Sequence, residues 1–191
     1  MPEREDPAAT SRFHSLCVYC GSSGTVSEIY RVAAKELGAC LADSGIELVF
    51  GGGKVGLMGL LADAALAKGG RVTGIIPVGL RDAELAHQGV SELVVVDTMH
   101  ARKALMAERA GAFAILPGGI GTLDETFETL SWKQLGLHDK PIFLVDVAGY
   151  WAPLRALLDR VVDAGFARPA THDLLEVVPT VSALIGKLVG S

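Results

Sequence analysis

The sequence has neither an excess of basic residues nor a long apolar run. Its 17 Lys and Arg residues stand against 22 Asp and Glu residues, which gives a net charge of −5 at pH 7. A surface without an overall positive field is poorly suited to nonspecific nucleic-acid binding, so any anion site must be local. The apolar runs at 93–96 and 142–145 are far shorter than the roughly 20 residues that span a bilayer, and no charged-then-apolar leader opens the chain. We therefore expect a cytoplasmic protein with no nucleic-acid partner and no membrane partner.

Cysteine is also scarce, with three residues that cannot pair completely. Cys17 and Cys20 form a C-x-x-C, but they lie within an apparent strand, where a spacing of three points two side chains to opposite faces. No second cysteine pair is present to complete a zinc site. Buried, inert thiols are the favoured interpretation, with redox or metal chemistry as the alternative.

The chain alternates short apolar runs with longer stretches of helical spacing. Residues 1–12 are polar and charged and are expected to form a disordered N-terminal tail. Residues 13–191 predict a single Rossmann-like domain of the α/β class, with a doubly wound, mainly parallel sheet between two helical layers. The expected strands are "HSLCVYC", "IELVFGGG", "RVTGIIP", "SELVVVD", "AFAILPGG", "KPIFLVD" and "LLEVVP". The polar, irregular stretch 81–89 should lie at the carboxyl edge of this sheet, where open α/β folds bind ligands.

Three of the expected strands end in glycine-rich loops, at 20–25, 51–59 and 117–122. Glycine permits close backbone approach, and a helix that begins at such a loop offers free N–H groups and the positive end of its dipole. Any one of these loops could be a plain tight turn. Together at one edge they favour a phosphorylated or nucleotide-like ligand.

The common cofactor and hydrolase motifs are missing or incomplete. Gly51, Gly53 and Gly56 satisfy G-x-G-x-x-G, but the strand "RVTGIIP" lacks the acidic residue that would bind the ribose of a dinucleotide. No P-loop, H-E-x-x-H or G-x-S-x-G occurs. We therefore expect neither a cofactor nor a metal, and an NAD-linked oxidoreductase is disfavoured.

Two acidic residues follow the third glycine loop. Thr122 to Glu125 reads T-x-x-E, so one interpretation is a capping box in which Thr122 caps a helix and Glu125 reaches back to it. The alternative is functional, because a carboxylate one turn into a helix that binds phosphate through its amides would lie near the sugar of a nucleotide.

A second candidate helix spans 97–111 and opens with a Thr98 cap. Spacings of three and four place two cations and two methionines on one face: Met99, Arg102, Lys103 and Met106. The cations could bind phosphate and hydroxyl oxygens, or their heads could lie in solvent or in surface ion pairs. A cation near a helix N-terminus opposes the dipole, which favours a functional role.

These motifs resemble the Lonely Guy family of cytokinin riboside 5′-monophosphate phosphoribohydrolases. "PGGIGTLDE" at 117–125 matches PGGxGTxxE and "MHARK" at 99–103 matches MHxRK, and the likeness extends over roughly residues 14–190, including "YCGSS" and "FGGGKVGLMG". Family members were long labelled lysine decarboxylases, although no pyridoxal-phosphate lysine context is evident. The resemblance implies that Arg102 and Glu125 are the catalytic pair. It also implies that the substrate is bound by Gly21, Ser22, Glu84, Arg102, Lys103, Gly118, Gly119, Ile120, Gly121, Thr122, Glu125 and Ser131.

The implied reaction is hydrolysis of the N-glycosidic bond of an adenine-type nucleoside 5′-monophosphate, either AMP or isopentenyladenosine monophosphate. We expect the amides of 118–122 to hold the phosphate, while Glu125 stabilises the oxocarbenium-like sugar and activates water. Arg102 is too weak an acid to donate a proton, so it would act electrostatically and keep Glu125 ionised. The alternative function is a noncatalytic nucleotide-binding or carrier protein of the same fold.

The expected helix 122–137 carries more apolar residues than packing on a sheet requires: Leu123, Phe127, Leu130 and Trp132. Such a surplus favours a symmetric contact between two copies of the chain. The family is commonly dimeric, and we therefore expect a homodimer.

Overall fold

The computed structural model of the chain describes residues 12–83 and 85–190 and contains one seven-stranded, wholly parallel sheet of order β4-β3-β2-β1-β5-β6-β7. Its strands are β1 (Ser15–Tyr19), β2 (Glu47–Phe50), β3 (Val72–Pro77), β4 (Glu92–Val96), β5 (Ala112–Ile115), β6 (Ile142–Val145) and β7 (Glu176–Val178). All seven apolar runs of the sequence therefore form strands, and the predicted α/β class is confirmed. The predicted disordered tail lies outside the described residues except for Arg12, whose N–H donates to the Leu188 carbonyl at 3.0 Å.

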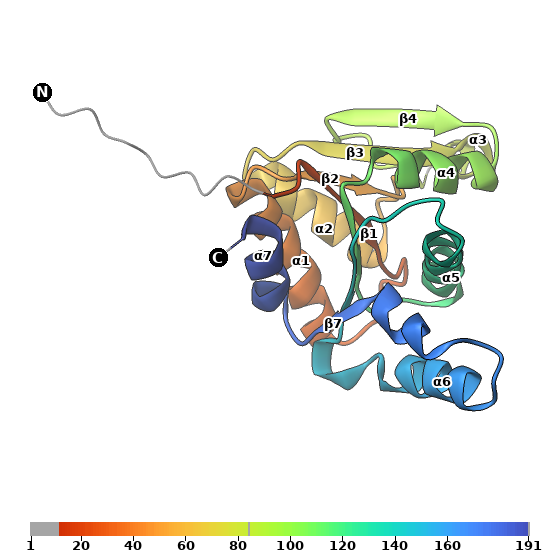
Figure 1. Cartoon of the computed structure of the whole chain (residues 1–191). Helices are drawn as coiled ribbons and strands as arrows, with labels where there is room; N and C mark the ends of the chain where they lie inside the picture. The colour runs from red at the N-terminus through yellow and green to blue at the C-terminus, as the bar shows by residue number, and fades with distance from the viewer. Residues whose placement is uncertain (1–11, 84, 191) are drawn as a thin grey trace, which may run out of the picture.

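Helices cover both faces of the sheet, as the doubly wound prediction requires (Figure 1). Helices α1 (Glu28–Asp43), α2 (Gly56–Ala67) and α7 (Val181–Val189) lie on one face, and α4 (Met99–Arg109), α5 (Ile120–Gln134) and α6 (Ala152–Asp163) on the other. Short helical segments α3 (Val78–Asp82), η1 (Val147–Gly149) and η2 (Pro169–Leu174) complete the connections. No helix in the described ranges is long and apolar enough to cross a membrane.

The alternation of side chains along β1 shows how the two faces are filled. Leu16 and Val18 belong to the core beneath α1, α2 and α7, whereas Cys17 and Tyr19 belong to the core beneath α4, α5 and α6. Cys20 lies with the first group. Cys17 and Cys20 therefore face opposite sides of the sheet as free thiols, and their deep burial raises the pKa of each thiol far above its ordinary value. The favoured interpretation of this C-x-x-C as buried thiols is confirmed.

Strand order brings the glycine loops together. The sheet runs from β1 to β2 in one direction and from β1 to β5 in the other, so a topological switch point lies between the loops that follow β1 and β5. The Gly21 N–H donates to the Pro117 carbonyl at 3.1 Å, and the Leu57 N–H donates to the Gly21 carbonyl at 2.9 Å. All three glycine loops therefore meet at one edge, as predicted.

The segment after β3 lies at the same edge, also as predicted, but it is more ordered than its polar sequence suggested. Its first residues form α3, and the next ones pair with the second glycine loop. Lys54 donates its N–H to the Leu85 carbonyl at 2.9 Å, and His87 donates its N–H to the Gly52 carbonyl at 2.8 Å. Glu84, which directly precedes Leu85 in the sequence, lies outside the described residues.

The packing of α1 on α2 generates a prediction about two helical glycines. A Cβ at Gly38 would overlap the Leu61 carbonyl oxygen on α2, whereas a Cβ at Gly186 in α7 would meet nothing within 4 Å. Gly38→Ala should therefore lower the free energy of unfolding by about 1–3 kcal/mol, because the helices must separate. Gly186→Ala should raise it by about 0.5–1 kcal/mol, because alanine favours the helix. Urea denaturation of both variants measures the two effects, and equal shifts in one direction would contradict this account of the α1–α2 contact.

Candidate active site

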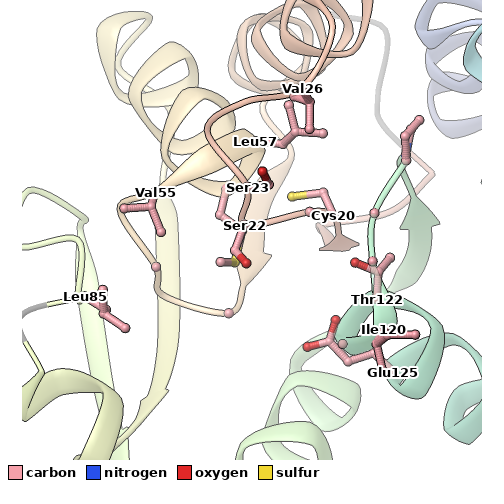
Figure 2. Close-up of a pocket in the computed structure, with 18 of the residues that line it drawn as sticks. Cys20, Ser22, Ser23, Val26, Val55, Leu57, Leu85, Ile120, Thr122 and Glu125 are labelled. Atoms are coloured by element: carbon pink, nitrogen blue, oxygen red, sulfur yellow. The ribbon is translucent and has the colours of Figure 1, made fainter.

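A pocket of about 540 Å³ opens at the carboxyl edge of the sheet. Its walls come from the loops after β1, β2, β3, β5 and β6. Figure 2 shows Thr122 and Glu125 entering it from α5, with Ser22 and Ser23 on the loop after β1 and Leu85 on the segment after β3. Among the predicted site residues, those that line it are Gly21, Ser22, Arg102, Gly118, Gly119, Ile120, Gly121, Thr122 and Glu125.

The N-terminus of α5 provides free amides at this pocket. The first bond of the helical ladder runs from the Leu123 N–H to the Gly119 carbonyl at 3.0 Å. The N–H groups of the preceding helical residues, 120–122, have no acceptor within the described parts of the chain. Unpaired amides at the positive end of a helix dipole form an anion site, so this end of the pocket is suited to a phosphate group.

The helix begins earlier than the capping-box interpretation required. Gly119 is the N-cap residue, so Thr122 is the third residue of α5 rather than its cap, and no side chain caps the helix. Glu125 does not reach back to the chain at Thr122; its carboxylate meets Arg102 instead. The capping-box alternative is therefore wrong, and Glu125 is directed at the pocket.

Arg102 is buried beneath the ends of two strands, with only 7% of its surface exposed. Its Nε donates to the Ile75 carbonyl at 3.1 Å, and its Nη2 donates to the Gly51 carbonyl at 3.3 Å. The third face of the guanidinium meets Glu125, with Nη1 3.3 Å from Oε1. A Cβ at Gly51 would overlap the guanidinium, so glycine is required there. The alternative in which the head of Arg102 stays in solvent is wrong.

Glu125 is 8% exposed, and its environment changes its acidity. Burial raises the pKa of Glu125 from its ordinary value near 4.5 to about 7, although the Arg102 guanidinium opposes that rise. The contact with Arg102 forms as predicted, but desolvation outweighs it, so the carboxyl is not held fully ionised at neutral pH. A carboxyl that titrates near pH 7 can both accept and donate a proton, as acid–base chemistry requires.

Lys103 points elsewhere, although it is the neighbour of Arg102. Its Nζ lies 3.0 Å from Asp124 Oδ2 and 3.1 Å from Glu128 Oε2, outside the pocket lining. These contacts join α4 to α5 and place one positive charge between two carboxylates that neighbour Glu125 on α5. The structure therefore separates Arg102 and Lys103, which the helical pattern had placed on one face.

Another predicted residue, Ser131, is not brought into the pocket. Ser131 is exposed, and its hydroxyl donates to the Phe127 carbonyl at 2.7 Å. Glu84 lies outside the described residues. Within the described parts of the chain, the predicted residues thus separate into a pocket group around Arg102 and Glu125 and a peripheral group of Lys103 and Ser131.

Sequence reasoning missed several lining residues. Tyr30 and Tyr150 form one wall, and Met58, Leu80 and Leu85 form an apolar part of the lining. Tyr150 follows β6, so the rule that the carboxyl ends of parallel strands share one edge could have indicated it. Tyr30 lies on α1 beyond the first glycine loop, and no motif in the sequence marks it.

The chain is similar to several known proteins over most of its length. Residues 58–188 match the family model described as "Possible lysine decarboxylase". The chain is 47% identical to a probable cytokinin riboside 5′-monophosphate phosphoribohydrolase of Oryza sativa subsp. japonica, over 93% of this chain and 73% of the relative. It is 44% identical to a cytokinin riboside 5′-monophosphate phosphoribohydrolase of Arabidopsis thaliana, over 93% of this chain and 83% of the relative. Among solved structures it is similar to the molybdenum cofactor carrier protein of Chlamydomonas reinhardtii, with a TM-score of 0.69 and 25% identity over 92% of this chain and 96% of that one.

The raised pKa of Glu125 predicts a pH-dependent stability. Between pH 4.5 and about 7 the folded state holds a proton that the unfolded state has lost, so this residue destabilises the fold progressively as pH rises through that window. Relative to wild type, Glu125→Gln should gain up to roughly 3 kcal/mol in free energy of unfolding between pH 5 and pH 8. Urea denaturation at both pH values measures this difference.

Glu108→Gln, which removes a carboxylate from the exposed side of α4, serves as the control. For the control, the difference from wild type in free energy of unfolding should be the same at pH 5 and pH 8. If that difference is also the same at both pH values for Glu125→Gln, Glu125 does not carry a raised pKa.

Proposed function

Because the chain belongs to the Lonely Guy family, we propose that it hydrolyses the N-glycosidic bond of cytokinin riboside 5′-monophosphates and releases the free base and ribose 5-phosphate. The observation that carries this proposal is the buried Arg102–Glu125 pair beside the free amides of α5, within one pocket. The names of relatives that are 44–47% identical over most of the chain support it. We treat residues 13–191 as one catalytic domain, which the single sheet supports.

In the proposed complex the two ends of the pocket bind different parts of the substrate. The 5′-phosphate lies against the amides of residues 119–122, where the helix dipole favours negative charge. The hydroxyl of Thr122, a buried side chain that lines the pocket, supplements these amides. Glu125, one turn further along α5, then faces the ribose. This arrangement separates the carboxylate from the phosphate. It explains how the first turns of one helix can bind the phosphate through their amides and present a carboxylate to the ribose.

The reaction needs a carboxylate that is ionised when the bond breaks. As the glycosidic bond breaks, its electron pair leaves with the base and positive charge develops on the sugar, which ionised Glu125 stabilises. Water then adds to the anomeric carbon, and its proton passes to Glu125, whose pKa near 7 suits this transfer. The departing base takes up a proton from solvent, and Glu125 returns its proton to solvent before the next turnover. Arg102 keeps its charge throughout and orients Glu125 and the sugar hydroxyls.

The lining supports a prenylated base over unmodified AMP. Met58, Leu80 and Leu85 present apolar surface in the pocket, and burial of an isopentenyl chain against such surface is favourable. Adenine alone would leave that surface in contact with water. We therefore propose isopentenyladenosine monophosphate as the better substrate.

A carrier function is the second candidate, because the fold is similar to that of a molybdenum cofactor carrier protein. A carrier would bind its ligand without turnover. A buried carboxyl that titrates near neutrality beside a fixed guanidinium is a costly feature for simple binding, and this favours the hydrolase.

The hydrolase proposal predicts the effect of removing either member of the pair. Glu125→Gln should lower kcat for release of free base by about 100-fold or more, and Arg102→Ala should lower it by about 10²–10³-fold. Base release from isopentenyladenosine monophosphate and from AMP should be followed by liquid chromatography. The prenylated nucleotide should give the larger kcat/KM.

Arg109→Ala is the matched control, because Arg109 lies on α4 as well but pairs with Glu92 on the surface. Its turnover should equal that of wild type. Near-normal turnover in Glu125→Gln or Arg102→Ala would remove that residue from the mechanism. Tight nucleotide binding by wild type with no base release would favour the carrier.

We further propose a cytoplasmic homodimer. Free thiols at all three cysteines support a reducing compartment. The dimer is supported by apolar side chains that α5 and the following turn leave in solvent: Phe127 is 38% exposed, Leu135 72% and Leu137 69%. Two residues that the sequence pattern assigns to this surface lie elsewhere: Leu130 packs into the core, and Leu123 packs against it.

This surface predicts that a charge at its centre prevents association. Phe127→Glu should convert the dimer to a monomer, because a second copy would have to bury the carboxylate. Light scattering coupled to size-exclusion chromatography gives the mass. Ile29→Glu introduces the same charge at an exposed apolar site on α1 and should remain dimeric. A monomeric wild type, or a dimeric Phe127→Glu, would exclude an interface on α5.

A further inference from the structure

Tyr150 reaches the pocket from a loop with an unfavourable backbone. After β6 the chain passes through two consecutive left-handed residues, Ala148 at φ 54° and Gly149 at φ 73°. Ala148 is the only non-glycine residue with positive φ in the described chain. Strained backbone of this kind is concentrated at functional sites, where the surrounding structure holds a side chain in a required position. The residue that directly follows these two, and whose side chain lines the pocket, is Tyr150.

The tyrosine is held on several sides. Its ring packs edge-on against Tyr30, with centroids 5.4 Å apart, and against Trp151, with centroids 4.8 Å apart. The backbone N–H of Trp151 donates to Asp146 Oδ1 at 2.7 Å, which fixes the turn from the other end. The hydroxyl of Tyr150 donates to the Gly118 carbonyl at 2.7 Å.

That carbonyl belongs to the loop whose amides we assign to the phosphate. Two consecutive carbonyls of this loop are bound by donors outside it: the Gly21 N–H holds the Pro117 carbonyl, and the Tyr150 hydroxyl holds the Gly118 carbonyl. In a trans peptide the C=O and N–H point in opposite directions. Fixing the Gly118 carbonyl therefore fixes the direction of the Gly119 N–H.

Without this contact the peptide between Gly118 and Gly119 could rotate, because neither residue carries a Cβ. Rotation would bring a carbonyl oxygen toward the anion and would repel it. The Gly21 N–H on the loop after β1 cannot replace the missing donor, because it is already bound to the Pro117 carbonyl.

We propose that Tyr150 is a positioning residue that holds the Gly118–Gly119 peptide with its N–H directed at the 5′-phosphate of the substrate. This assignment rests on the proposed function for the identity of the anion. Tyr150 acts through the loop, so its hydroxyl serves binding of the phosphate rather than cleavage of the glycosidic bond.

Tyr150→Phe tests the role, because it removes the hydroxyl and keeps the ring. Loss of one neutral hydrogen bond that orients a binding group should weaken the affinity for ribose 5-phosphate by about 5- to 10-fold. Affinity for adenosine, which has no phosphate, should stay within about 2-fold of wild type, because the hydroxyl acts only through the loop amides. In turnover, KM for the nucleotide should rise by a similar factor while kcat changes little. Calorimetry gives both affinities.

Tyr19→Phe is the matched control. It removes the same kind of group, a tyrosine hydroxyl with a hydrogen bond, here to Thr129 at 3.1 Å, but Tyr19 is not among the residues that line the pocket. Its affinity for ribose 5-phosphate should equal that of wild type. An equal loss in both variants would assign the effect to a general disturbance of the fold and overturn the proposal.

The remaining outcomes are also decisive. Unchanged ribose 5-phosphate binding in Tyr150→Phe, or an equal loss of adenosine binding, would show that the hydroxyl does not act through the phosphate. A wild-type protein that does not bind ribose 5-phosphate would overturn the role as well. If Tyr150→Phe selectively loses ribose 5-phosphate but wild type releases no base, the positioning role stands and the hydrolase proposal fails.

Discussion

The buried guanidinium of Arg102 is the constraint around which the pocket is arranged. A charge removed from water is costly unless its hydrogen-bonding groups find partners. Here the guanidinium is surrounded by the Ile75 carbonyl of β3, the Gly51 carbonyl just after β2 and the carboxylate of Glu125. Each partner belongs to a different element, so Arg102 joins β3, the end of β2 and α5. Loss of any of these contacts would leave part of a buried charge without a partner, which ties the fold of this edge to the chemistry of the site.

The same arrangement sets the charge of Glu125. Asp124 and Glu128 lie beside it on α5 and raise its pKa, and Lys103 and Arg102 on α4 oppose them. Tyr19, Cys17 and Cys20 on the strand side are buried, and burial raises the pKa of each, so they add no charge at neutral pH. Burial is the largest effect on Glu125. The two adjacent cations of α4 therefore have separate partners, because Arg102 meets Glu125 and Lys103 meets Asp124 and Glu128.

The sequence was sufficient to predict the parallel sheet and the meeting of the three glycine loops at its edge. Seven apolar runs separated by helical stretches are compatible with few sheet topologies, and parallel strands all end at the same edge. It was misleading at Thr122, because T-x-x-E is a local pattern and cannot show that Gly119, at φ −97° and ψ −153°, already caps the helix. It was also misleading for Lys103, because consecutive helical residues point about 100° apart and only packing decides which one enters the pocket. Tyr30 and Tyr150 come from separate elements, and no local pattern could have joined them.

The glycines of this edge are required mainly for space. Gly51 leaves room for the Arg102 guanidinium, Gly118 leaves room for the Thr122 side chain, and Gly56 leaves room for the backbone at Ser22. Of these three only Gly56 also needs a left-handed backbone, at φ 65°. A glycine-rich motif is often taken as a sign of flexibility, but these loops are packed against side chains and held by hydrogen bonds from outside. In the proposed complex the amides are already aligned, so binding of the phosphate would not include the cost of ordering the loop, and that free energy would remain available to hold the sugar against Glu125.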